Sequence, residues 1–223
     1  MIEGVDVSHY QGLIDWPRVA AAGKKFAILK ATDGMGMGLT GPKKRNVDAL
    51  FNHNEQGAIG TQIVLGMYHF MRPLENLQGQ INSFIAMEHW SKDALFPMLD
   101  LEPIKQGPGT QEDWAVNSKQ DNLMMVLEWL HQVERNTGYK AVIYTTNFFV
   151  EAFLPLAPEL AEYPLALARY SSEPGRIPPP WRTWNFWQYD PAGKVDGIQG
   201  TVDLDYFDGT LEDLKTLTRK RMA

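Results

Sequence analysis

Two acidic residues, Asp100 and Glu102, stand two positions apart at the end of the apolar run 95–103. Successive side chains of a strand point to opposite faces, so these two carboxylates share a face and start roughly 7 Å apart along the strand. Pro103 has no N–H for a ladder, which places the acids where strand pairing ends. Acids on the packed face of a strand suit acid–base chemistry, whereas a strand end that dips into water would leave them as surface charge.

A carboxyl pair hydrolyses glycosides when one member stays protonated and donates to the leaving oxygen. The same oxygens could instead hold a hard cation such as Mg²⁺ or Ca²⁺. The Gly-rich segment 34–38 lacks the Gly-Lys-Ser/Thr ending of a phosphate-binding loop, and we expect it to be a loop at the rim of the fold. His9 and His69 match no zinc spacing and are expected to be hydrogen-bonded structural residues. The residues therefore favour hydrolysis with no metal or other cofactor.

The composition is that of a globular protein, with 223 residues, 44% hydrophobic and 22% charged side chains. A net charge of −6 argues against a nucleic-acid partner, and the absence of cysteine excludes disulfides and thiolate metal sites. No run approaches the eighteen or so apolar residues of a membrane span, and residues 1–6 lack the features of a secretory signal. We expect a monomer without membrane or nucleic-acid partners.

Strands and helices alternate through the first two-thirds of the chain. Eight runs rich in β-branched and aromatic residues predict strands at 4–8, 26–30, 63–70, 96–100, 141–145, 165–168, 186–188 and 202–205. Helices are predicted after the Asp15 cap and at 42–57, 76–90, 118–137, 147–153 and 211–219. Alternation favours a parallel sheet, and eight strands in about 200 residues favour a closed TIM-like α/β barrel with an irregular second half. No linker divides the chain, so residues 1–223 are expected to form a single catalytic domain.

In such a barrel the chemistry lies at the C-terminal ends of the strands. The candidates at those ends are Asp6, Asp33, His69, Asp100, Glu102, Tyr144, Tyr170, Gln188, Asp203 and Asp205. The first and eighth strands are neighbours in a closed barrel, so Asp6 and Asp203 should lie side by side. Acids from strands one, four and eight would then share one hollow, where mutual repulsion raises the pKa of one member.

An aromatic run at 184–189 surrounds Gln188. Alternation puts Gln188 on one face of the predicted strand and Trp187 on the other, so part of this run belongs to the core. Aromatic rings also stack on sugars, which makes Trp187 a candidate substrate contact.

Six motifs, in order, resemble those of glycoside hydrolase family 25 lysozymes. They are 4–12 (GVDVSHYQG), 26–34 (FAILKATDG), 66–70 (GMYHF), 99–102 (LDLE), 186–189 (FWQY) and 202–207 (VDLDYF). The match runs nearly end to end. It implies an irregular barrel of five β/α units followed by three strands, (β/α)5(β)3. It also implies an N-acetylmuramidase that cleaves the β-1,4 bond between N-acetylmuramic acid and N-acetylglucosamine in peptidoglycan.

The resemblance assigns roles to individual residues. Glu102 would be the proton donor, and Asp100 would support the reacting sugar, by orienting its 2-acetamido group or by stabilising positive charge. The remaining expected site residues are the carboxylates Asp6 and Asp203 and the substrate contacts Tyr68, Gln188, Tyr144, Tyr170, Asp33 and Trp187. The chain departs from the family in having Asp33 where Glu is usual and Asp205 where Asn is usual.

The expected protein is a lysozyme that acts on the bacterial cell wall, outside the cell or in the periplasm. Export could come from phage lysis as an endolysin, from a secretion apparatus or from a trimmed leader. A wall-binding module that lost its chemistry and a chitinase on the same barrel are the alternatives. The intact pair of Asp100 and Glu102 argues against the first, and the shortness of the acidic series argues against the second.

Overall fold

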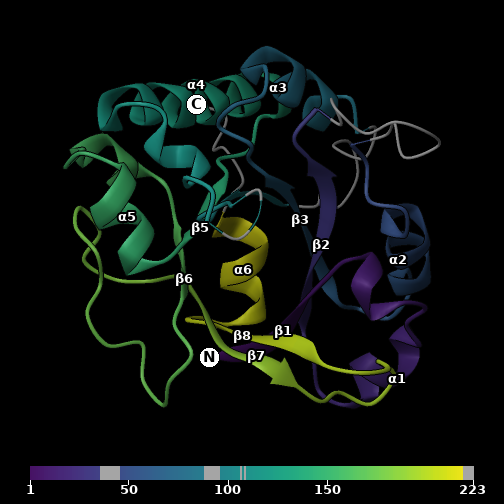
Figure 1. Ribbon diagram of the computed structural model, residues 1–223. Coiled ribbons are helices and arrows are strands. Elements are labelled where there is room, and N and C mark those ends of the chain that lie inside the picture. Colours follow the sequence, from purple (N-terminus) through teal and green to yellow (C-terminus); the bar gives the residue numbers. More distant parts are fainter. Residues whose placement is uncertain (36–45, 88–95, 106, 108, 218–223) are drawn as a thin grey trace.

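The computed structural model describes residues 1–35, 46–87, 96–105, 107 and 109–217 (Figure 1). Eight strands close into a barrel in sequence order. They are β1 Ile2–Val7, β2 Phe26–Asp33, β3 Val64–Phe70, β4 Phe96–Leu101, β5 Val142–Thr145, β6 Leu165–Ala168, β7 Phe186–Gly193 and β8 Val202–Phe207. All eight predicted strands are present, and the prediction of a closed α/β barrel is confirmed.

A helix follows each of the first five strands. These are α1 Trp16–Ala21, α2 Phe51–Ala58, α3 Leu77–Ile85, α4 Lys119–Thr137 and α5 Asn147–Phe153. Residues 169–201, all of them described, contain no α-helix, so β6, β7 and β8 succeed one another through loops. The last helix is α6 Leu211–Leu217. α3 and α4 lie side by side across the outside of the barrel (Figure 1).

The direction of the last strand sets the two ends of the barrel. β1 to β7 pair parallel to one another, whereas β8 is antiparallel to both β7 and β1. The start of β8 therefore lies at the same end of the barrel as the C-terminal ends of the other seven strands. We call this end the mouth and the opposite end the floor.

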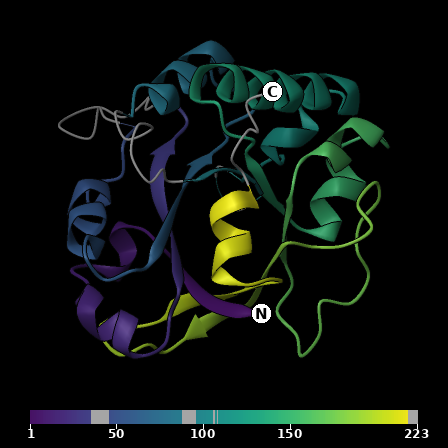
Figure 2. The same ribbon diagram turned by 180° about the vertical axis from the view of Figure 1, so that it is seen from behind.

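Four phenylalanines fill the floor. Phe26, Phe96 and Phe207 surround Phe186, with ring centroids 5.5, 5.4 and 4.9 Å from that ring. Leu214 joins this inner core from α6, the yellow helix in the centre of Figure 2. A Cβ atom at the inward-facing Gly66 would lie 2.4 Å from the Phe96 ring, and Gly4 stands in the same relation to Phe26. Both glycines thus leave room for a ring.

Alternate strand residues point outward into a second, larger core beneath the helices. Leu29, Met67 and Leu99 belong to it, together with Trp129 of α4 and other fully buried side chains. Burial of so many apolar side chains between sheet and helices is the main source of stability of this layer.

The helix predictions were accurate where the caps are strong and wrong where they are weak. Ser118 accepts a hydrogen bond from the Asp121 N–H to cap α4, and Gly138 ends that helix at φ 79°. The helix predicted at 42–57 begins only at Phe51, because 46–50 form a bridge and a turn, while 42–45 lie outside the described residues. The helix predicted at 76–90 ends at Ile85. Residues 88–90 and 218–219 of the predicted helices, and 36–38 of the Gly-rich segment, lie outside the described residues.

Candidate active site

The inner face of β4 carries the leading candidates. Met98 points into the barrel, so alternation brings Asp100 and then Glu102 to the same face, while Leu99 packs in the outer core. Asp100 is only 5% exposed, and Glu102, one residue beyond the strand, is half-buried. The carboxyl pair thus lies at the mouth with its face turned into the barrel.

Two further acids come from the strands that close the barrel. The register of β1 and β8 makes Asp6 and Asp203 direct cross-strand partners, as a closed barrel predicts. We call Asp6, Asp100, Glu102 and Asp203 the acid cluster. Asp205 lies two residues deeper, opposite Gln188 of β7, and is almost fully buried.

Burial and mutual repulsion disfavour the ionised forms of these acids. Burial, followed by the negative charges of neighbouring acids, raises the pKa values of Asp6 and Asp100 well above their ordinary range. The same causes raise the pKa of Asp203 to about 6. Within the described part of the chain, Oδ1 of Asp100 is buried without a hydrogen-bond partner. The cluster therefore cannot hold all its negative charges at neutral pH without cost.

The pKa of Glu102 is subject to opposing influences. Burial raises its pKa most strongly, while a hydrogen bond with Tyr144 and the positive charge of Lys30 act to lower it. The net pKa is raised. A carboxyl with a raised pKa that faces a shared site is suited to donate a proton.

Hydroxyl and amide groups line the side of the mouth next to Glu102. The Tyr144 hydroxyl donates to Oε1 of Gln188 at 2.8 Å, and the Tyr170 hydroxyl donates to the same oxygen at 3.0 Å. Burial raises the pKa values of Tyr68 and Tyr144 well above the usual range, so both hydroxyls remain protonated. These groups can hydrogen-bond a polar ligand without adding charge.

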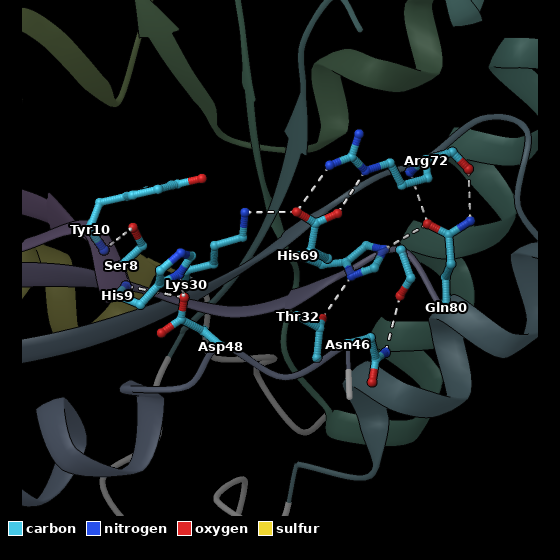
Figure 3. A network of polar contacts seen from close by, with 12 residues as sticks. Ser8, His9, Tyr10, Lys30, Thr32, Asn46, Asp48, His69, Arg72 and Gln80 are labelled. Atoms are coloured by element: carbon cyan, nitrogen blue, oxygen red, sulfur yellow. Dashed lines mark hydrogen bonds and ion pairs between the residues drawn. The ribbon is translucent and has the colours of Figure 1, made fainter. Parts of the chain in front are cut away.

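Asp33 is engaged by two cations. Its Oδ1 accepts from Arg72 Nε at 2.7 Å, and its Oδ2 accepts from Lys30 Nζ at 2.9 Å and Arg72 Nη2 at 3.1 Å (Figure 3). These charges lower its pKa, although burial opposes them. Both oxygens thus have protein partners, which leaves little capacity for a direct contact with substrate.

The site thus combines acids, hydroxyl groups and the cations Lys30 and Arg72, an arrangement suited to hydrogen-bonding a polar ligand and to proton transfer. The family model for glycosyl hydrolases family 25 matches residues 5–198. The chain belongs to this family. Membership makes it a glycoside hydrolase of the lysozyme and muramidase type, as its motifs predicted, and supports peptidoglycan as its substrate.

Relatives match this family 25 hydrolase over almost its whole length. The uncharacterised protein YegX of Escherichia coli K12 is 32% identical over 96% of this chain and 72% of its own. Lysozyme M1 of Streptomyces globisporus is 31% identical over 97% of this chain and 71% of its own. The crystal structure of a lysozyme from Streptomyces coelicolor superposes with a TM-score of 0.86 and 29% identity, covering 100% of this chain and 98% of that one.

Trp187 lies outside the mouth of this family 25 hydrolase. It projects from the face of β7 opposite Gln188, its ring packs near Tyr206, and its Nε1–H donates to the carbonyl of Arg169 at 2.8 Å. The prediction of a sugar contact for Trp187 is therefore not supported by its position. The alternation of β7 gives this ring a structural place between strand and loop.

The two histidines occupy structural positions. His69 faces the helices, where its ring stacks on Trp129 and hydrogen-bonds Thr32 at 2.7 Å and Gln80 at 3.1 Å (Figure 3). Burial lowers its pKa to about 4, so it is neutral at physiological pH. His9 lies 2.6 Å from the buried Asp48 carboxylate, on the loop after β1 (Figure 3). These contacts agree with the expectation of hydrogen-bonded structural histidines.

Lys30 also lies at the site, although it is not among the candidates predicted from the sequence. Its side chain is 13% exposed and points into the barrel above Ile28, where its charge acts on Asp6 and Asp100. The signal was available, because alternation from Phe26 places Lys30 on the inner face of its strand.

Within the described ranges of the chain, no three His, Asp or Glu side chains form a group that could hold a metal ion. No helix among the same residues is long and apolar enough to cross a membrane.

Proposed function

We propose that this family 25 hydrolase is an N-acetylmuramidase that cleaves the β-1,4 bond between N-acetylmuramic acid and N-acetylglucosamine. Glu102 acts as the general acid and Asp100 supports the reacting sugar. The observation that carries the proposal is the acid cluster itself, in which a partly exposed glutamate with a raised pKa stands beside a buried aspartate.

Glu102 protonates the leaving oxygen. Its raised pKa lets Glu102 hold its proton to a higher pH than an ordinary glutamate, and its partial exposure lets the group reach a bound glycan. Protonation is needed because an alkoxide is a poor leaving group, and cleavage then develops positive charge on the sugar ring.

Asp100 faces that positive charge. Its unpartnered Oδ1 can accept a hydrogen bond from the 2-acetamido N–H and orient that group for attack, or it can stabilise the charge directly. Positive charge arriving on the sugar favours the ionised form of Asp100, which burial disfavours in the free protein. The interaction is thus stronger in the transition state than in the ground state.

The other residues bind and surround the substrate. Tyr68, Tyr144, Tyr170 and Gln188 supply hydrogen-bonding groups at the mouth, and the carboxyl groups of Asp6 and Asp203 lie beside the reacting centre. The proposed enzyme works on the cell wall as a monomer, residues 1–223 acting as one catalytic domain without a cofactor and without nucleic-acid or membrane partners.

Product analysis tests the proposed bond. Purified peptidoglycan is digested, the new reducing ends are reduced with borohydride, and the fragments are identified by mass spectrometry. We expect reduced N-acetylmuramic acid at every new end. Reduced N-acetylglucosamine, or binding to walls without release of reducing ends, would contradict the proposal, and preference for chitin oligomers would indicate a chitinase.

The proposed acid is tested by Glu102→Gln, which keeps the shape of the side chain and removes its acidic proton. We expect turnover to fall by about 10²–10⁴-fold. Glu128→Gln on the exposed face of α4 is the matched control and should leave turnover unchanged. Near wild-type turnover of the Glu102 variant would remove Glu102 from the mechanism.

A further inference from the structure

Lys30 stands among acids from several elements. β2 turns its side chain into the barrel, and the register places it beside Tyr68 of β3. Its Nζ lies 5.9 Å from the centroid of the Tyr68 ring and 5.0 Å from that of Phe70. Such a cation is enclosed by aromatic surface on one side and by carboxyl groups on the other, with little water to screen it.

A second cation and a shared carboxylate fix this position. Asp33 joins Lys30 to Arg72 through the three hydrogen bonds described above (Figure 3), and the Arg72 guanidinium lies 4.6 Å from the Phe70 ring centroid. The Lys30 amine is therefore held at one place rather than swinging freely among the acids.

A β-bulge makes this ion pair possible. The pairing of β2 with β3 shifts between Lys30 and Thr32, so that Ala31 is an extra residue. Ala31 packs in the outer core and Thr32 bonds the outward-facing His69, so both residues point toward the helices. Simple alternation from Lys30 would have turned Asp33 outward as well. The bulge returns Asp33 to the face of Lys30, an effect typical of bulges beside functional sites.

We propose that Lys30, clamped by Asp33 and Arg72, is a positioning residue that sets the distribution of protons over the acid cluster. This inference rests on the proposed function for its catalytic meaning, although the charge balance itself can be measured in the resting protein. Asp33 then serves the site through Lys30 rather than through the substrate.

Lys30 and Asp33, the two members of the ion pair, have opposite effects on the pKa values of nearby acids. The positive charge of Lys30 lowers the pKa values of Asp6, Asp100 and Glu102, whereas the negative charge of Asp33 raises that of Asp100. The titratable and charged groups that face Lys30 are Asp6 from β1, Asp33 from β2, Tyr68 from β3, Arg72 after β3, and Asp100 and Glu102 from β4.

The test compares pH profiles of kcat/KM for Lys30→Met, Lys30→Arg and Asp33→Asn. Lys30→Met removes the cation and should move both limbs of the profile to higher pH by about one unit. Lys30→Arg keeps the charge and should restore the wild-type limbs. Asp33→Asn leaves two cations uncompensated and should move the limbs to lower pH. Arg18→Met, at the exposed ion pair with Asp196, is the control and should leave both limbs in place.

Opposite shifts distinguish this role from a structural one. Loss of activity at every pH with unmoved limbs, or shifts of equal sign for Lys30→Met and Asp33→Asn, would overturn the proposal. Asp33→Asn retains Lys30 and tests the sign alone should Lys30→Met fail to fold.

Carbon-13 NMR titration of the carboxyl groups in the ligand-free protein supplies a readout that needs no turnover. We expect the carboxyl pKa values of the acid cluster to rise in Lys30→Met and fall in Asp33→Asn. Unmoved carboxyl titrations would refute the role of Lys30 even in an active enzyme. Moved titrations in a protein whose Glu102→Gln variant keeps full turnover would refute the proposed function alone.

Discussion

The floor and the mouth of the barrel are both built from inward-pointing residues of the same strands. Phe26 and Lys30 both point inward from β2, and Phe96 and Asp100 both point inward from β4. At the floor these positions carry aromatic rings in mutual contact. At the mouth they carry ionisable groups, some of which lack hydrogen-bond partners among the described residues.

The difference separates stability from chemistry within one interior. A floor residue contributes packing, so its loss costs folding free energy. A mouth acid is buried at a cost in folding free energy, and under the proposed mechanism its loss should cost activity instead. Substitutions at the two ends test whether floor residues affect mainly stability and mouth residues mainly activity.

Phe96→Ala should give the largest loss of stability. Removing the ring leaves a cavity beside Phe186, and we expect the free energy of unfolding to fall by about 3–5 kcal/mol. Turnover per folded molecule should stay near wild type, because the mouth does not contact the ring. Urea unfolding and active-site-normalised rates measure both, with the exposed Phe148→Ala as control.

Asp100→Asn should reduce activity and leave stability unchanged or slightly higher. We expect kcat/KM to fall by about 10²–10³-fold, because the amide cannot supply the negative charge that meets the developing cation. Burial of the carboxylate is disfavoured, so the variant should unfold at the same urea concentration as wild type or a higher one. A clear loss of stability would show that the mouth is a structural element like the floor.

Gly66→Ala tests how tightly the floor is filled. The added methyl would lie 2.4 Å from the Phe96 ring, so we expect a loss of about 1–3 kcal/mol from overpacking. The double variant with Phe96→Ala should lose less than the sum of the two single variants, since the smaller side chain relieves the clash. Additive losses would indicate that the backbone at Gly66, and not the ring, responds to the substitution.

Asp203→Asn should have the smallest effect, and one that depends on pH. The folded-state pKa of about 6 lies above the ordinary value of 3.8, so ionised Asp203 destabilises the fold at neutral pH. The variant should gain no more than about 1 kcal/mol at pH 7, once solvent screening is allowed for. This gain should shrink as pH falls from about 6 and disappear below about 3.8. Thermal melts across this range give the measurement, and a gain that persists at low pH would contradict the sign.

Much of the fold could be predicted, because its signals are local. The content of β-branched and aromatic residues identified all eight strands, and the caps at Ser118 and Gly138 marked the ends of α4. The order of the strands also brought Asp6 and Asp203 together, since closure of a barrel makes the first and last strands neighbours.

The remaining features depend on pairing between strands. The bulge at Ala31 exists only in the register of β2 against β3, and alternation alone would place Asp33 on the face opposite that of Lys30. Likewise, β7 and β8 extend to Gly193 and Phe207 because each pairs with the other, which no local signal predicted.

The antiparallel β8 has a consequence for a chain emerging from the ribosome. Barrel closure joins Ile2 to Phe207, so β1 keeps an open edge until the chain has been made as far as β8. Asp6 meets Asp203 only at that step. A nascent chain that ends before β8 therefore lacks the acid cluster, and under the proposed mechanism it should be inactive.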